Sequence, residues 1–140
     1  MVRVMASGVF DILHTGHISY LEQAKAMGDE LYVVVACDDT VRKRKHEPIT
    51  PENMRLKIVS SLKVVDKAFL GSSGGDMYSI LEVVKPDIIV LGFDQTLDEK
   101  ELESDLRSKG YNIQVRRANQ SGEDLEATRA IIRKIRQRGE

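Results

Sequence analysis

Short apolar runs alternate along the chain with segments whose apolar residues recur at helical spacing. The runs at residues 2–6, 31–36, 64–70, 87–91 and 113–116 predict five strands. Helices are predicted over residues 18–27, 51 to about 62, 76–84, 98–109 and 125–137. This alternation of strands and helices predicts a single α/β domain over residues 1–140. Its expected architecture is a doubly wound, mostly parallel five-stranded sheet with helices on both faces.

Local signals support several of these elements and mark their ends. The run at 31–36 (LYVVVA) lacks the alternation of a half-exposed strand, which is typical of a strand covered on both faces. Thr50 and Pro51 suit the N-cap and the first helical position of the helix that follows them. Gly110 is expected just beyond the end of another helix. The polar, basic segment 37–48 is expected to form a loop or a short helix.

Composition excludes several classes of protein. A length of 140 residues suffices for one domain with a substantial core, and a net charge of -1 argues against a general nucleic-acid-binding protein. No apolar run approaches the length of a membrane span and the N-terminus lacks a signal-peptide pattern, so a cytoplasmic protein without a membrane partner is expected. The single Cys37 excludes a disulfide framework and a multi-cysteine metal site, and a buried thiol is expected.

The distinctive loops of the chain all follow predicted strands. They comprise residues 7–17, 37–48, 92–96 and 118–124. In a parallel sheet with helices on both faces, ligands bind beyond the carboxyl ends of the strands. We therefore expect these four loops to converge on one site.

The first of these loops joins a strand to the N-terminus of a helix. Such a terminus offers unpaired N–H groups and a partial positive charge, which suit a phosphate. His14 and His17 can donate hydrogen bonds to phosphate oxygens or carry positive charge towards a developing anion. Gly16 between them lets the backbone approach closely. For one histidine a helix-capping or surface role is the simpler explanation, but the pair in this context predicts a phosphate-binding site.

The remaining loops hold side chains for which a functional and an ordinary role are both open. The cations at 42–45 (RKRK) can clamp a polyphosphate, or can be a solvated surface run. Arg55 can reach the same phosphates, or form a salt bridge with Glu52 on the same helix face. Asp94 can bind a base or a ribose, or can hold a metal through water.

Residues 8–17 (GVFDILHTGH) resemble the GxFDxxHxGH signature of the cytidylyltransferase-like nucleotidyltransferases, and the resemblance covers the chain nearly end to end. The segments 28–31 (GDEL), 38–41 (DDTV) and 91–95 (LGFDQ) most resemble those of the small archaeal FAD synthases, which adenylylate FMN with ATP. The glycerol-3-phosphate cytidylyltransferases match nearly as well in the first part of the chain. The resemblance implies a Rossmann-like nucleotidyltransferase fold.

The resemblance also implies roles for individual residues. Several would bind the nucleotide through backbone or side-chain groups: Val9, Phe10, His14, Thr15, Gly16, His17, Arg55 and Asp94. Both imidazoles would stabilise the transition state, with Lys43 and Lys45 as candidates for a catalytic lysine. Asp11 would help to hold the acceptor. Relatives often place a Ser/Thr-rich turn before the last helix, where only Thr128 and Arg129 remain here to contact phosphate, unless they are an ordinary exposed pair.

The reaction implied by the resemblance is transfer of AMP from ATP to FMN, giving FAD and pyrophosphate. The acceptor phosphate is already an anionic nucleophile, so catalysis needs orientation and charge neutralisation rather than a general base. Mg²⁺ is implied by the triphosphate and not by a protein metal site. Cytidylyl transfer to glycerol-3-phosphate or a sugar phosphate is one alternative, and a non-catalytic nucleotide-binding module is another. Relatives suggest a homodimer.

Overall fold

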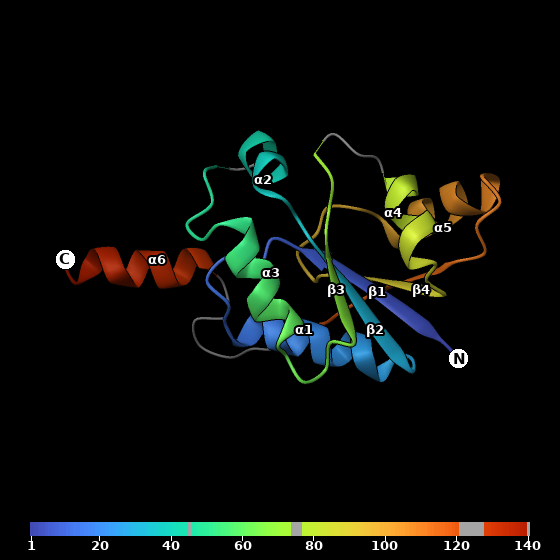
Figure 1. Cartoon of the computed structure of the whole chain (residues 1–140), viewed down its shortest axis with the longest axis horizontal. Coiled ribbons are helices and arrows are strands. Elements are labelled where there is room, and N and C mark those ends of the chain that lie inside the picture. The colour runs from blue at the N-terminus through green and yellow to red at the C-terminus, as the bar shows by residue number, and fades with distance from the viewer. Residues whose placement is uncertain (45, 74–76, 121–127, 140) are drawn as a thin grey trace.

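The computed structural model of the chain describes residues 1–44, 46–73, 77–120 and 128–139. Five strands form one parallel sheet in the order β3-β2-β1-β4-β5 (Figure 1). The strands are β1 (Arg3–Gly8), β2 (Glu30–Val35), β3 (Lys67–Leu70), β4 (Ile88–Leu91) and β5 (Gln114–Arg117). The helices are α1 (Thr15–Ala26), α2 (Asp38–Arg44), α3 (Glu52–Ser60), α4 (Met77–Val84), α5 (Glu99–Ser108) and α6 (Thr128–Gln137). The predicted fold class is confirmed.

Helices cover both faces of the sheet, and each face has its own core (Figure 1). α1 and α3 pack on one face, whereas α4 and α5 pack on the other. Consecutive residues of a pleated strand point to opposite faces. In β2, Val33 therefore joins the first core and Val34 the second. This two-sided burial is the reason why residues 31–35 of β2 are apolar without interruption.

Several element ends differ from the prediction. α1 begins at Thr15, earlier than expected, because His14 caps it. The N-cap of α3 is Pro51 and not Thr50, whose hydroxyl instead donates to a carboxylate of the first loop. Residues 64–66 lie outside β3. The predicted starts of the helices at 76–84 and 125–137 lie outside the described residues, which omit 74–76 and 121–127.

The central strand β1 lies between β2 and β4, and the strand order runs outward from it in both directions. The carboxyl ends of β1 and β4 are therefore the topological switch point, where sheets of this kind bind their ligands. The loop after β1 holds the histidine pair, and the loop after β4 holds Asp94. The connectivity alone thus brings two of the predicted loops together.

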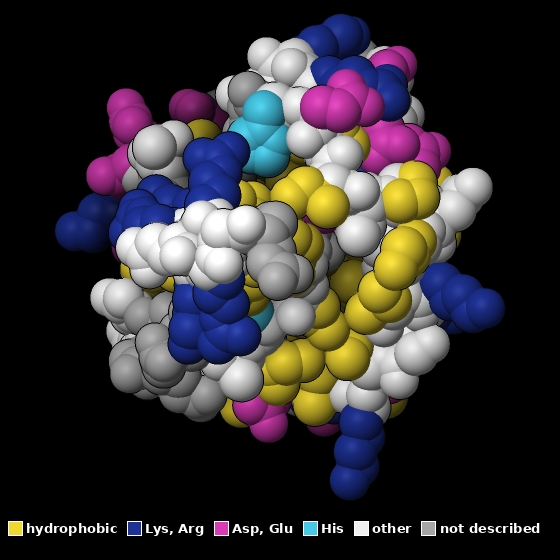
Figure 2. All heavy atoms as spheres, turned by 90° about the vertical axis from the view of Figure 1, so that its left-hand side faces the viewer, with side chains coloured by type: hydrophobic (Ala, Val, Ile, Leu, Met, Phe, Trp, Pro, Cys, Tyr) yellow, Lys and Arg dark blue, Asp and Glu magenta, His cyan; other side chains and the backbone are white. Residues whose placement is uncertain are grey.

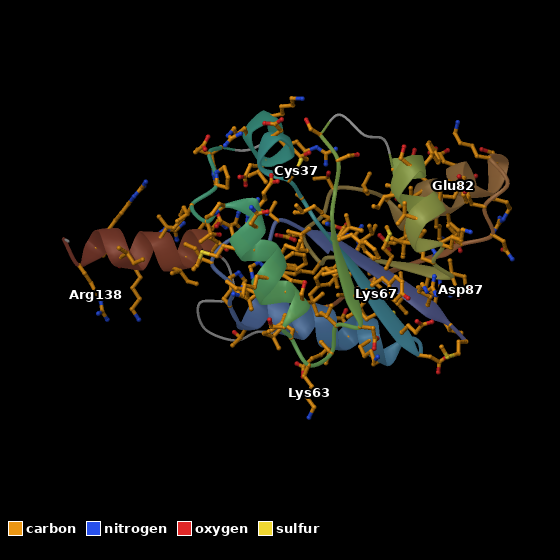
Figure 3. All side chains as sticks on the ribbon, in the orientation of Figure 1. Cys37, Lys63, Lys67, Glu82, Asp87 and Arg138 are labelled. Atoms are coloured by element: carbon orange, nitrogen blue, oxygen red, sulfur yellow. The ribbon has the colours of Figure 1, made fainter. Side chains whose placement is uncertain are left out.

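The C-terminal helix α6 projects away from the rest of the molecule (Figure 1), and none of its residues is buried. Arg138 follows the last residue of α6, and its side chain points outward in Figure 3. Within the described part of the chain, no helix combines the length and the apolar composition needed to cross a bilayer.

Candidate active site

The loop between β1 and α1 has a strained backbone, and α1 after it is tied to both β1 and β4. Phe10 and Ile12 have φ angles of 57° and 52°, which residues with a side chain adopt only where their surroundings impose them. The Tyr20 hydroxyl of α1 accepts a hydrogen bond from the Ser7 backbone at 3.1 Å and donates one to the Val90 carbonyl at 2.6 Å. Burial raises the pKa of Tyr20 above its ordinary value, so this hydroxyl stays a neutral donor.

His14 and His17 form a reciprocal cap at the N-terminus of α1. Nδ1 of His14 accepts a hydrogen bond from the Gly16 N–H at 3.0 Å, and Nδ1 of His17 accepts one from the His14 N–H at 3.2 Å. The two rings stack with their centroids 3.8 Å apart and their planes 23° from parallel. A capping box usually pairs Ser or Thr with Glu or Gln, whereas here two imidazoles take both positions.

This capping pattern determines which nitrogen of each ring carries the proton. Because Nδ1 of both His14 and His17 accepts a backbone hydrogen bond, the proton of each neutral ring lies on Nε2. An Nε2–H group is a donor suited to a phosphate oxygen, and the helix N-terminus adds its own partial positive charge. The helix-capping role and the phosphate-binding role are therefore compatible, since they use different ring nitrogens.

Asp11 faces protein backbone rather than open space. Its side chain is buried, and its carboxylate accepts hydrogen bonds from the Ile49 N–H at 2.8 Å, the Thr50 N–H at 2.9 Å and the Thr50 hydroxyl at 2.6 Å. Burial by itself raises the pKa of Asp11, but these hydrogen bonds and the charge of Arg55 outweigh it, so the pKa lies below its ordinary value. Asp11 thus fastens the segment before α3 to the first loop, and the predicted contact with an acceptor finds no support in these bonds.

Arg55 is also buried, with 1% of its surface exposed. Its Nε donates to the Thr50 carbonyl at 3.0 Å, and its Nη1 donates to the carbonyls of Val9 at 2.8 Å and Ala36 at 2.7 Å. Nη2 completes the set with an ion pair to Asp38 at 2.6 Å. All three nitrogens are engaged by protein oxygens. The sequence suggested that Arg55 contacts the triphosphate or forms a salt bridge with Glu52 within α3. In the structure its side chain instead joins α2, the start of α3 and the backbone that follows β1 and β2.

The basic segment lies on α2, directly after β2. Arg42 pairs with Asp39 at 3.1 Å and with Glu47 at 2.9 Å, so acidic neighbours offset part of the repulsion among the cations. Lys43 is exposed in the last turn of α2. Lys45 lies outside the described residues. Lys43 is therefore the candidate lysine that the structure places.

The loop after β4 is held by Arg117, a residue that the sequence analysis did not single out. Its guanidinium donates to the carbonyl oxygens of Gly92 at 2.9 Å, Gln95 at 2.8 Å and Leu97, and it pairs with Glu99. These contacts fix the backbone on both sides of Asp94. In the sequence Arg117 follows a predicted strand and carries no motif, so nothing pointed to this role.

The start of α6 reaches the same place. The Thr128 hydroxyl donates to the Asp11 carbonyl at 2.6 Å, and Arg129 beside it is exposed. The exposed Asp94 is near enough to Tyr20 that its negative charge adds to the rise in the tyrosine pKa. The loops after β1 and β4 and the N-terminus of α6 thus meet at the switch point. Viewed from the side of α6, basic side chains gather next to exposed hydrophobic ones (Figure 2).

The other predicted nucleotide-binding residues lie in the first loop and in the first turn of α1. Val9 is half-buried and Phe10 is buried, whereas Thr15 is exposed. Gly16 presents its N–H to His14. Cys37 lies next to α2 (Figure 3) and is buried, as predicted. Among residues 1–44, 46–73, 77–120 and 128–139, no three His, Cys, Asp or Glu side chains gather as metal ligands.

Comparison with known proteins connects this geometry to a family. A family model described as cytidylyltransferase-like matches residues 5–137. An FAD synthase of Aciduliprofundum boonei is 55% identical over 136 residues, which cover 96% of this chain and 91% of the relative. An FAD synthase of Methanohalophilus mahii is 50% identical over 139 residues, covering 99% of this chain and 96% of the relative.

Solved structures show the same fold. The lipopolysaccharide core biosynthesis protein of Thermoplasma volcanium aligns with a TM-score of 0.82 and 53% identity, over 86% of this chain and 98% of that chain. A pantoate-beta-alanine ligase of Francisella tularensis aligns with a TM-score of 0.59 over 84% of this chain and 58% of that chain. Its identity of 15% makes this second likeness one of fold alone.

Proposed function

The chain belongs to the cytidylyltransferase-like family, and we propose that it is an FAD synthase that transfers AMP from ATP to FMN. A phosphate oxygen of FMN attacks the α-phosphorus of ATP, the bond from that phosphorus to the bridging oxygen breaks, and pyrophosphate leaves. The reciprocal histidine cap at the switch point of the sheet is the observation that carries the proposal. The names and identities of the FAD synthase relatives supply the substrate pair.

The histidine pair supports this reaction by placing two hydrogen-bond donors at the positive end of α1. Negative charge builds on the α-phosphate and the departing pyrophosphate, so donors fixed in advance stabilise the transition state more than the ground state. Nδ1 of each ring is bound to the backbone, which limits the rotation of His14 and His17. The pair thus acts as a rigid element that needs little reorganisation during transfer.

Other residues around the cap are proposed to bind the nucleotide. The phosphates fit the N-terminal turn of α1 at Thr15 and Gly16, while Asp94 meets the ribose or the base. The backbone of Val9 and Phe10 flanks the nucleotide. Lys43, Lys45 and Arg129 are proposed to supply further positive charge, and Thr128 a hydroxyl group.

Asp11 and Arg55 are proposed to act by holding this arrangement together. Asp11 fixes the backbone at Ile49 and Thr50, and Arg55 fixes it at Val9, Ala36 and Thr50. The basic segment on α2 lies between these attachment points. Both side chains therefore determine where the cations of this segment lie relative to the histidines.

A divalent cation is proposed to arrive with ATP. Mg²⁺ is commonly held by substrate phosphates and one or two carboxylates while it keeps several waters, so a protein cage is not needed. Asp94, exposed in the loop after β4, is the alternative candidate for a carboxylate ligand through water, in place of its contact with the ribose or the base. When bound, the cation would offset the charge of the triphosphate.

We also propose that two copies of the chain associate through α6. The apolar side chains Ile131, Ile132 and Ile135 lie on this projecting helix, and Ile135 is 52% exposed. A ten-residue helix is marginally stable in water without packing. α6 carries basic residues and no acidic ones, whereas the rest of the chain has an acidic excess. Apolar area and charge therefore both favour the body of a second copy as the partner.

The predicted cytoplasmic location stays a prediction.

The function is tested with purified protein, Mg²⁺ and four substrate pairs: ATP or CTP, each with FMN or glycerol-3-phosphate. Pyrophosphate release and product identity are measured for each. ATP with FMN should give pyrophosphate and FAD in equal amounts. Turnover only with CTP and glycerol-3-phosphate would establish the cytidylyltransferase alternative instead. Nucleotide binding without turnover of any pair would identify a binding module.

A further inference from the structure

Phe10 contacts His17, one member of the histidine pair, from the interior of the protein. Its ring is 4% exposed and meets the ring of His17 edge to face, with the centroids 5.3 Å apart and the planes at 63°. The Phe10 ring also stacks against the ring of Tyr20 on α1, with the centroids 6.5 Å apart and the planes at 16°. Such aromatic contacts have preferred geometries and so restrict the orientation of both partners. One turn of α1 thus rests on the Phe10 ring.

The backbone leaves this ring little freedom. Phe10 has a φ of 57°, a conformation that side chains disfavour. The carbonyl groups on either side are fastened: that of Val9 by Arg55 at 2.8 Å and that of Asp11 by Thr128 at 2.6 Å. Strain at a position that its neighbours hold so firmly is typical of functional loops.

Gly8 provides the space for the ring. A Cβ atom added to Gly8 would lie 3.1 Å from both Cε2 and Cζ of Phe10, closer than ordinary van der Waals contact. The ring is enclosed by the core and cannot yield without moving its neighbours. Gly71, just after β3, provides the contrast, because a Cβ there would meet Val34 at an ordinary 3.5 Å.

From these contacts we infer that Phe10 is a positioning residue for His17, and that Gly8 is required because any side chain there would displace the Phe10 ring. The inference rests on the proposed function only for its kinetic consequence. The ring sets the orientation of the His17 imidazole, and the Gly16–His14–His17 cap then fixes its Nε2–H. Gly8 thus acts on catalysis through one intervening side chain.

The kinetic test compares Gly8→Ala, Phe10→Leu and the double variant with Gly71→Ala as the matched control. Displacing a catalytic group by a fraction of an ångström should lower kcat about tenfold in Gly8→Ala, with little change in the KM for ATP. Gly71→Ala should keep the wild-type kcat. Leucine lacks the ring that the new methyl group strikes, so the double variant should lose no more activity than Phe10→Leu alone.

A second measurement reads His17 without substrate. The chain has three histidines, His14, His17 and His46, so ¹⁵N–¹H spectra of the side chains are simple to assign. Wild type should show the Nε2–H form at His14 and His17. Gly8→Ala should shift the ring signals of His17 and leave those of His46, on an exposed segment, unchanged. Gly71→Ala should leave all three unchanged.

The outcomes separate the inference from the proposed function. If Gly8→Ala matches Gly71→Ala in kcat and in the His17 spectrum, the positioning role of Phe10 is wrong. It is also wrong if the double variant loses the product of the two single effects, because the two residues then act independently. If wild type releases no pyrophosphate from ATP and FMN, the proposed function fails, while the spectra still decide whether the ring orients His17.

Discussion

The guanidinium of Arg55 lies 2.6 Å from the carboxylate of Asp38, and the two residues are 17 positions apart in the chain. The Arg55 side chain has no exposed surface, whereas that of Asp38 is 18% exposed. Three backbone carbonyls complete the shell of Arg55. The sequence suggested a phosphate contact for Arg55, but in the structure Arg55 holds together the loops around the site.

Arg55→Met should destabilise the protein strongly. The substitution keeps much of the side-chain volume but leaves Asp38 without its partner and three carbonyls without a donor. Removing one member of a buried ion pair costs about 3–5 kcal/mol. Urea unfolding measures this loss, and Arg44→Met at an exposed position of α2 is the control. Wild-type stability combined with a greatly raised KM for ATP would restore the predicted triphosphate contact.

His14→Asn should separate the two roles of His14. Asparagine is a good N-cap and can accept the hydrogen bond from the Gly16 N–H, so the free energy of unfolding should stay close to that of wild type. The imidazole Nε2–H is lost, which should lower kcat by roughly 10²–10³. His14→Ala should lose the same activity and about 1 kcal/mol of stability as well.

For His17→Ala we expect the same range of loss in kcat, roughly 10²–10³, because one fixed donor to the developing charge disappears. Steady-state kinetics with ATP and FMN measure it. A loss of less than tenfold would contradict the catalytic role of His17. His46→Ala, on an exposed segment, is the control that should retain full activity.

The strand pattern and the first loop were predictable from the sequence because they depend on local signals. Uninterrupted apolar runs mark buried strands, and the histidines mark a helix N-terminus. The role of Arg55 was not predictable, because it depends on carbonyls of Val9 and Ala36 that only the tertiary fold brings together. The same holds for Arg117, which binds three carbonyls of a distant loop.

Thr50 shows how a local signal can mislead. Its position before Pro51 fits an N-cap, and N-cap residues normally turn their hydroxyl towards their own helix. Here the hydroxyl donates to Asp11 at 2.6 Å, so a long-range carboxylate outcompetes the helix terminus. The left-handed backbone of Phe10 is likewise invisible in sequence, since nothing but packing imposes it.

Asp11 should make stability depend on pH in the acid range. Its pKa is lowered in the folded protein, so its hydrogen bonds contribute fully above the ordinary value of 3.8 and are lost as the pH falls through the folded pKa. The difference in unfolding free energy between wild type and Asp11→Asn should therefore shrink below about pH 3.8. Thr50→Val removes one of the donors to Asp11. The difference in unfolding free energy between wild type and Thr50→Val should therefore also shrink at low pH, by a smaller amount. A difference that stays constant down to low pH would contradict the lowered pKa.

Ile135→Asp should dissociate the proposed dimer. The substitution places a charge among the apolar side chains of α6. Burying this charge against a second copy would require removing it from water. Sedimentation velocity should show a dimer for wild type and a monomer for the variant. Val83→Asp is the matched control, because Val83 is 60% exposed but lies on α4, on the opposite side of the sheet from α1 and α3. It should remain a dimer.

The same variant tests whether association supports the site. α6 begins at Thr128, whose hydroxyl holds the Asp11 carbonyl next to the strained Phe10, so anything that secures α6 also secures this loop. Dissociation through Ile135→Asp should therefore lower kcat as well as the sedimentation coefficient, although Ile135 is two helical turns from Thr128. A wild-type protein that sediments as a monomer at all concentrations, and retains its turnover, would show that α6 meets a different partner or none.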